Sequence, residues 1–174
     1  LSKYGYEIQP LLSVTGLFNF RSQFSKGYKY NADGSRELLS DILAPGYILL
    51  SMGLDYKPVK GLSIFLSPLT SRWTIVNNDS LAAKKLYGVD SAKNVQKSIG
   101  AFASITCNMG ISPIISYNGR VDLFSNYEHN PQNVDFLMNN MFVAKLSKFL
   151  SASLALDLIY DDDVKLFGPK QDAP

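Results

Sequence analysis

Two groups of oxygen-bearing side chains are the first candidates for a chemical site in this sequence. Asp161, Asp162 and Asp163 are consecutive, and residues 77–79 read Asn-Asn-Asp. Carboxylate and amide oxygens are ligands that Ca²⁺ prefers in proteins. The spacing differs from the Asp-x-Asp-x-Asp-Gly pattern of calcium-binding loops, so we expect both groups to lie in solvated loops. The three consecutive aspartates remain weak candidates for a metal site.

A catalytic histidine is the second candidate. His129 is the only histidine and lies in the segment YEHNPQN. A serine hydrolase would need it beside a serine, but the Gly-x-Ser-x-Gly context of many such enzymes is absent from the sequence. Cys107 is the only cysteine, so it forms no intramolecular disulfide and builds no metal site alone. We therefore expect no enzymatic activity and no cofactor.

Charged residues of both signs stand within otherwise apolar or small-residue segments. Rings of charge set the ion preference of a pore, whereas opposite charges that pair across the interior close a small barrel. The two signs are nearly balanced here, so both interpretations stay open. The residues that we expect to face a polar interior are Arg21, Asp55, Lys57, Arg72, Arg120, Asp122, Lys145 and Asp157.

The elements that would position these charges are long strands with two different faces. In SIGAFASITCNMGI (98–111), apolar residues occupy nearly every odd position, and mainly small or polar residues occupy the even ones. A period of two indicates a β-strand. The same alternation recurs in SVTGLFNFRSQF, YILLSMGLDYK and LSASLALDLIY.

Seven strands follow from this pattern, and we expect no helix. Their connections alternate between long and short, which is typical of an antiparallel up-and-down barrel with long loops at one end. Several strands reach the ~9–11 residues that cross a bilayer at a tilt. Asn118-Gly119 is interpreted as a kink within one strand rather than a hairpin turn, because this keeps the alternation of loop lengths. The predicted strands are 12–28, 46–57, 62–76, 97–109, 114–126, 136–147 and 151–161.

The composition limits the classes of protein. A chain of 174 residues is expected to form a single domain. A net charge of +2 provides no basic field for nucleic acid, which we exclude as a partner. Charged residues make up 18% of the chain, below the roughly 25% of soluble domains. No apolar run approaches the ~18 residues of a transmembrane helix, and the first residues do not resemble a signal peptide; a transmembrane β-barrel would show no long apolar run either.

Aromatic residues gather near the predicted strand ends, where a membrane barrel carries its girdles. They are Tyr28, Tyr30, Tyr47, Trp73, Tyr127 and Tyr160 at the long-loop end, and Tyr56 and Phe149 at the other end.

The apolar faces have two possible surroundings. In a transmembrane barrel they contact lipid, and the residues that we expect there are Phe18, Phe20, Ile48, Leu50, Ile99, Ile105, Leu154 and Leu156. In a soluble β-barrel the polarity is reversed, and most of the same residues would line a cavity for a lipid or another apolar ligand. Small polar residues opposite large apolar ones favour the membrane.

The segment DLFSNYEHNPQNVDF (122–136) carries a family resemblance, together with KFLSASLALDLIYDDDVK, GYILLSMGLDYKP and SIFLSPLTSRWTIV. The chain resembles an uncharacterised bacterial family, catalogued as a domain of unknown function and regarded as outer-membrane β-barrels. The resemblance implies the outer membrane of a Gram-negative bacterium, with outer-membrane lipid and other outer-membrane proteins as partners. Members of that family extend further, so we expect residues 1–174 to form an incomplete barrel domain, with roughly ten to fourteen strands in the whole protein.

The expected function is non-enzymatic. A barrel of this kind is a porin-like pore or transporter for a small solute, or a structural subunit of an outer-membrane complex.

Overall fold

The main feature of the fold is one antiparallel sheet of eight strands, seen in a computed structural model that describes residues 1–31, 34–83, 87, 89 and 93–160. The strands lie in the order β1-β2-β5-β6-β7-β8-β9-β10, so neighbours in the sheet also follow one another along the chain. They are β1 (Ser2–Gln9), β2 (Leu12–Ser22), β5 (Gly46–Tyr56), β6 (Leu62–Ile75), β7 (Val95–Gly110), β8 (Ile115–Asn126), β9 (Val134–Lys145) and β10 (Ser151–Tyr160).

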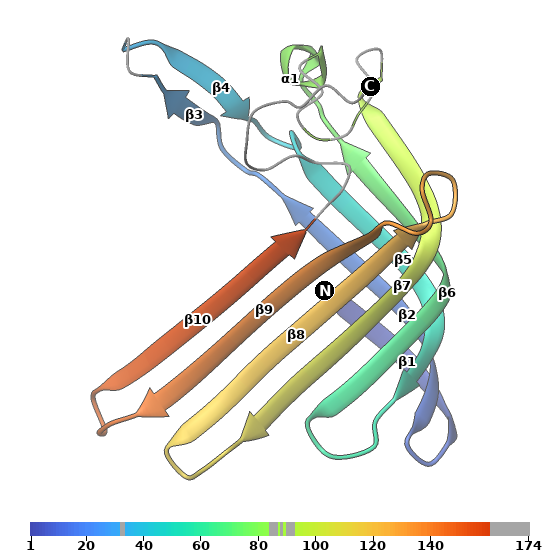
Figure 1. Cartoon of the computed structure of the whole chain (residues 1–174), viewed down its shortest axis with the longest axis vertical. Coiled ribbons are helices and arrows are strands. Elements are labelled where there is room, and N and C mark those ends of the chain that lie inside the picture. Colours follow the sequence, from blue (N-terminus) through green and yellow to red (C-terminus); the bar gives the residue numbers. More distant parts are fainter. Residues whose placement is uncertain (32–33, 84–86, 88, 90–92, 161–174) are drawn as a thin grey trace.

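The connections divide into two ends of the sheet (Figure 1). Short turns join β1 to β2, β5 to β6, β7 to β8 and β9 to β10. The longer connections at the opposite end hold the hairpin of β3 (Gly27–Tyr30) and β4 (Arg36–Ser40) and the short helix α1 (Asp79–Ala83). The predicted alternation of long and short connections is therefore confirmed for the described residues.

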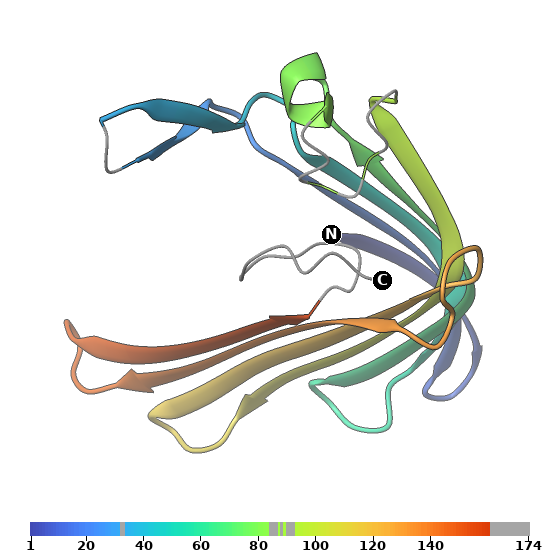
Figure 2. The same cartoon turned by 45° about the horizontal axis from the view of Figure 1, so that its top comes forward.

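The sheet is strongly bent (Figure 2). Strands β1, β2 and β5 stand on one side of an open trough and β9 and β10 on the other, with β6 and β7 at the bend. Within the described residues, β1 pairs with β2 alone and β10 with β9 alone. The fold is thus all-β with an antiparallel main sheet, as predicted, but the described part of this sheet does not close into a barrel.

All seven predicted strands are present, with two corrections to the expected layout. The segment expected as one strand over 12–28 ends at Ser22, and residues from Gly27 onward belong to a separate hairpin. An eighth strand, β1, precedes those predicted. The continuous strand β8 contains Asn118 and Gly119, which confirms the interpretation of that pair as part of one strand.

The short helix α1 also corrects the expectation of no helix. Its amino end is capped by Asn78, whose Oδ1 accepts hydrogen bonds from the backbone N–H of Ser80 (3.1 Å) and Leu81 (3.3 Å). Asparagine is among the best residues for this position. A helix of five residues is too short to show a helical period in the sequence. No helix in the described part of the chain has the length and hydropathy needed to span a membrane.

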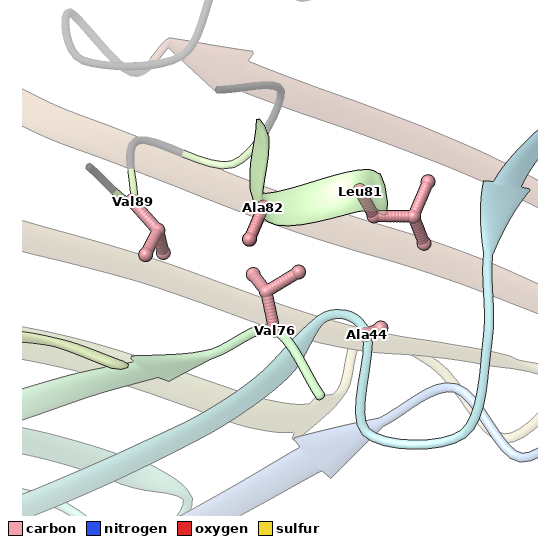
Figure 3. Close-up of a cluster of buried hydrophobic side chains, with 5 residues drawn as sticks. All are labelled: Ala44, Val76, Leu81, Ala82 and Val89. Carbon is pink, nitrogen blue, oxygen red and sulfur yellow. The ribbon is translucent and has the colours of Figure 1, made fainter. Parts of the chain in front are cut away.

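A small apolar core joins the long connections (Figure 3). It consists of Ala44, Val76, Leu81, Ala82 and Val89, all buried. Tyr87 packs against it and donates a hydrogen bond to the carbonyl oxygen of Leu39 at the end of β4. Burial raises the pKa of the Tyr87 phenol above its ordinary value, because removal from water disfavours the phenolate.

A bulge in β6 lies at the bend of the sheet. One extra residue of β6 is accommodated between Ser67 and Thr70 opposite β7, and between Leu66 and Leu69 opposite β5. Pro68 lies inside this bulge, where its missing N–H removes no regular pairing. The Thr70 hydroxyl lies 2.9 Å from that of Ser67 and 2.8 Å from that of Ser51. These bonds satisfy polar groups where the regular ladder is interrupted.

Gly53 permits the close approach of β5 to this bulge. A Cβ atom at Gly53 would lie 2.1 Å from the carbonyl oxygen of Leu66 and 2.7 Å from the Cα of Ser67. Both contacts are with backbone and cannot be relieved by rotating a side chain. We therefore expect this glycine to be required for the bend.

Substitution of Gly53 tests the packing at the bend. We expect Gly53→Ala to lower the free energy of unfolding by about 1–3 kcal/mol, as overpacking does in other cores. The measurement is urea unfolding, followed through the fluorescence of Trp73, the only tryptophan. The control is Gly110→Ala in β7, because a Cβ there meets nothing within 4 Å and a change within about 0.5 kcal/mol is expected. Equal effects of the two substitutions would contradict this account.

Candidate functional site on the concave face of the sheet

The register of the strands sorts the side chains onto two faces. Residues that are direct partners on neighbouring antiparallel strands point to the same side of a sheet. Arg72 pairs with Ser98, and Ser104 pairs with Asp122, which in turn pairs with Leu137. When this register is followed across the sheet, all eight residues predicted for a polar interior share one face: Arg21, Asp55, Lys57, Arg72, Arg120, Asp122, Lys145 and Asp157.

Contacts between strands that are not neighbours identify this face as concave. Lys3 of β1 lies 3.2 Å from Ser63 of β6, although β2 and β5 separate the two strands. Arg72 of β6 forms an ion pair with Asp135 of β9, across β7 and β8. Three strand spacings of a flat sheet amount to ~14 Å, which is beyond the reach of one such pair. The sheet therefore bends toward its charged face.

Asp55 is the most buried charged group of this face, with 2% of its surface exposed. The Ser63 hydroxyl donates a 2.5 Å hydrogen bond to its Oδ1. The ammonium groups of Lys3 and Lys57 lie 3.8 and 3.7 Å from its carboxylate oxygens. A buried carboxylate needs such partners because removal from water disfavours its charged form.

Arg120 and Asp122 form a second pair, two residues apart on β8. The Nε of Arg120 lies 2.9 and 2.8 Å from the two carboxylate oxygens of Asp122. The Ser104 hydroxyl of β7 donates to Asp122 Oδ1 at 2.7 Å. Together with Asp55 and its partners, this pair forms a group of charges near the short turns.

The larger of two cavities on this concave face has a volume of about 660 Å³ and is lined by residues of the strands from β2 to β10. Arg72 stands in its lining, with its guanidinium 4.2 Å from the centre of the Phe124 ring. Arg21 and His129 also line it. Polar and aromatic side chains together thus surround a volume within the range of small-molecule sites.

The opposite, convex face is mainly apolar, with Lys97, Ser71 and Asn140 among its polar exceptions. The register puts all eight residues predicted to contact lipid on this face: Phe18, Phe20, Ile48, Leu50, Ile99, Ile105, Leu154 and Leu156. Further large apolar residues on it are exposed as well, among them Val14, Met52, Leu54, Leu66, Leu69 and Leu158. The two predicted sets of side chains are therefore separated by the sheet as expected.

The aromatic residues at the strand ends are distributed less regularly than predicted. Trp73, Tyr160 and Tyr56 lie on the convex face. Tyr47 lies on the concave face, opposite Arg21. Tyr28 and Tyr30 belong to the β3–β4 hairpin, outside the main sheet, because the strand predicted over 12–28 ends before them.

The candidate metal and catalytic residues have other surroundings. Asp161, Asp162 and Asp163 lie outside the described residues. Asp79 accepts a 2.8 Å hydrogen bond from Asn94. No group of three or more His, Cys, Asp or Glu side chains suited to a metal occurs in the described ranges. His129 is exposed, with its Nε2 3.4 Å from the amide nitrogen of Asn130.

Sequence reasoning missed several residues of the concave face. Lys3 was missed because β1 was not predicted, although SKYGYEIQ alternates Tyr4, Tyr6 and Ile8 with smaller or charged residues. Asp135 was assigned to a connection, whereas it lies one residue inside β9. The ion pairs themselves depend on the bend, which no local pattern reveals.

Comparisons with protein-family models, curated proteins and solved structures find no match to this chain. The fold and its two faces define an all-β protein with one strongly bent antiparallel sheet. The resemblance to an outer-membrane family, with the location and partners it implies, stays a prediction.

The buried carboxylate of Asp55 provides a test of the charged group. We expect Asp55→Asn to lower the free energy of unfolding by about 2–4 kcal/mol, because the substitution leaves two ammonium groups without their anion. The matched control is Asp157→Asn on the exposed edge strand β10, where a change of less than about 0.5 kcal/mol is expected. Urea unfolding measured with Trp73 fluorescence distinguishes the two, and an unaffected Asp55→Asn variant would contradict the described role.

Proposed function

We propose that this chain is part of an outer-membrane β-barrel of a Gram-negative bacterium. In this proposal the convex face contacts lipid and the concave face borders an aqueous interior. The observation that carries it is the distribution of polarity: the concave face holds all the ion pairs between described residues of the sheet, beside a buried cluster of Leu17, Phe65, Phe102 and Phe124, and exposed apolar side chains cover the convex face.

The physical argument concerns the cost of exposing the convex face to water. Each Å² of apolar surface in water costs roughly 25 cal/mol. Soluble monomers rarely expose contiguous apolar patches of more than a few hundred Å². In hydrocarbon the same surface is favourable, and the outward-facing apolar band is a general property of transmembrane barrels.

The alternative, a soluble barrel that binds a lipid or other apolar ligand, would need the apolar residues to line the cavity. Phe18, Leu50 and Leu154 represent that set, and all three lie on the convex face. Of that set only Ile48 lines the larger cavity, which also borders Arg21, Arg72 and Asp122. The polarity of the sheet therefore favours the membrane proposal over this alternative.

The directions of the two edge strands limit how the sheet can close into a barrel. Strands β1 and β10 run in opposite directions, because they are the first and last of eight antiparallel strands, with six between them. They can pair with each other directly, or an even number of further antiparallel strands can stand between them. We propose the second arrangement, in which further strands complete a barrel larger than the eight described.

Two roles fit such a barrel, and both are non-enzymatic. A pore or transporter for a small polar solute is favoured by the cavity of about 660 Å³ on the concave face, since a polar interior lowers the cost of crossing hydrocarbon. A structural subunit of an outer-membrane complex is favoured by the β3–β4 hairpin, which projects from the sheet and exposes Tyr30 (Figure 1).

A lysine substitution on the convex face tests whether that face is surrounded by lipid or by water. Met52 lies in the middle of β5 and 64% of its surface is exposed. We expect Met52→Lys to lower the free energy of unfolding in bilayers by about 2–4 kcal/mol, the cost of a lysine near the bilayer centre. In a soluble protein, the same change at such an exposed position would alter it by less than about 0.5 kcal/mol.

The experiment compares full-length proteins in outer-membrane fractions by heat-modifiable gel mobility and by urea unfolding in vesicles. Asn19→Lys on the concave face is the matched control, and we expect it to keep the folded band. Recovery of the unmodified protein in the soluble fraction, or a Met52→Lys variant as stable as the original, would contradict the proposed function.

A further inference from the structure

Three cations converge on the concave face near the short turns. Lys3, Lys57 and Arg120, here called the basic cluster, are accompanied by the carboxylates of Asp55 and Asp122. The Lys3 ammonium lies 3.2 Å from the Ser63 hydroxyl, and Ser63 pairs with Thr106, the direct partner of Arg120 in the sheet. The group thus holds one more positive than negative charge, within electrostatic range of one another.

A cavity of about 310 Å³ adjoins the basic cluster. Lys3, Lys57 and the carboxylate of Asp55 line it, together with four hydroxyl groups. The residues that supply these hydroxyls are Ser13, Thr15, Ser63 and Thr106. The Ser63 hydroxyl donates its proton to Asp55, whereas each ammonium group carries three donors, so the cavity suits a ligand with acceptor oxygens.

Arg120 does not line this cavity but is the sheet partner of a residue that does, and one of its donors is unused. Its Nε serves both oxygens of Asp122, whereas its Nη2 is buried and has no hydrogen-bond partner among the described residues. Thr106, which lines the cavity, is the direct partner of Arg120 in the sheet. Arginine keeps its charge in proteins, and a buried unsatisfied donor is costly. If the guanidinium turns toward the cavity, an acceptor oxygen from a ligand would remove that cost.

We propose that the basic cluster binds a phosphate group of a solute inside the barrel. The assignment rests on the proposed function, since the cavity must face an aqueous interior for a solute to reach it. A phosphate group supplies negative charge between the three cations and several acceptor oxygens for the surrounding hydroxyls. Asp55 and Asp122 hold the cations in place and limit the excess charge, which lets the solute leave again.

The test is a titration of the folded, full-length protein with inorganic phosphate in an uncharged, phosphate-free detergent. Calorimetry is expected to show saturable binding. Arg120→Gln and Lys57→Gln are each expected to weaken it at least tenfold. Lys57 has a largely exposed side chain, so its substitution leaves folding intact even if the Arg120 variant does not fold. Lys97→Gln, on the convex face opposite Trp73, is the control that keeps full affinity.

Three results would overturn the inference: no saturable binding, equal binding by the Lys57 variant, or binding seen only with phosphatidylglycerol micelles, which would assign the phosphate to lipid. Each of these leaves the proposed function standing if the protein still shows a heat-modifiable band in the outer-membrane fraction. Recovery of the protein in the soluble fraction would overturn the proposed function, whatever the phosphate titration shows.

Discussion

The bend of the sheet toward its charged face is the constraint on which the rest of the structure depends. Lys3 meets Ser63, and Arg72 meets Asp135, only because strands three places apart are brought together. The bend also collects polar groups where they can pair with one another, and it spreads the apolar side chains over the outside. A glycine and a bulge at β5 and β6 permit this shape, since a side chain at Gly53 would collide with the backbone of Leu66.

Much of the fold could be predicted because a strand repeats every two residues. The alternation in β7 and β10 identified both the strands and the members of each face, and the register then placed Arg120 opposite Thr106. The hairpin β3–β4 escaped prediction because strands of four and five residues carry little periodic signal. The Lys3–Asp55 pair escaped for another reason: it joins β1 to β5 across β2 through the curvature of the sheet, which no local pattern reveals.

The two faces of the sheet have different roles in the proposed barrel. In the proposed barrel, the convex face is the surface that would contact lipid, through its exposed apolar side chains. The concave face provides ion pairs and two cavities, one bordered by Arg72 and the other by Lys3 and Lys57. The long connections are held by a core of their own around Leu81, separate from both faces.

The central claim is that the convex face contacts lipid, and Trp73 tests it most directly. This residue lies on the convex face, between Ile48 and Lys97 in the register, and is the only tryptophan in the sequence. The measurement is the quenching of its fluorescence when the full-length protein is reconstituted in vesicles of brominated lipid. The account predicts strong quenching relative to unbrominated vesicles. Fluorescence that is unchanged by bromine but quenched by iodide in the surrounding water would contradict it.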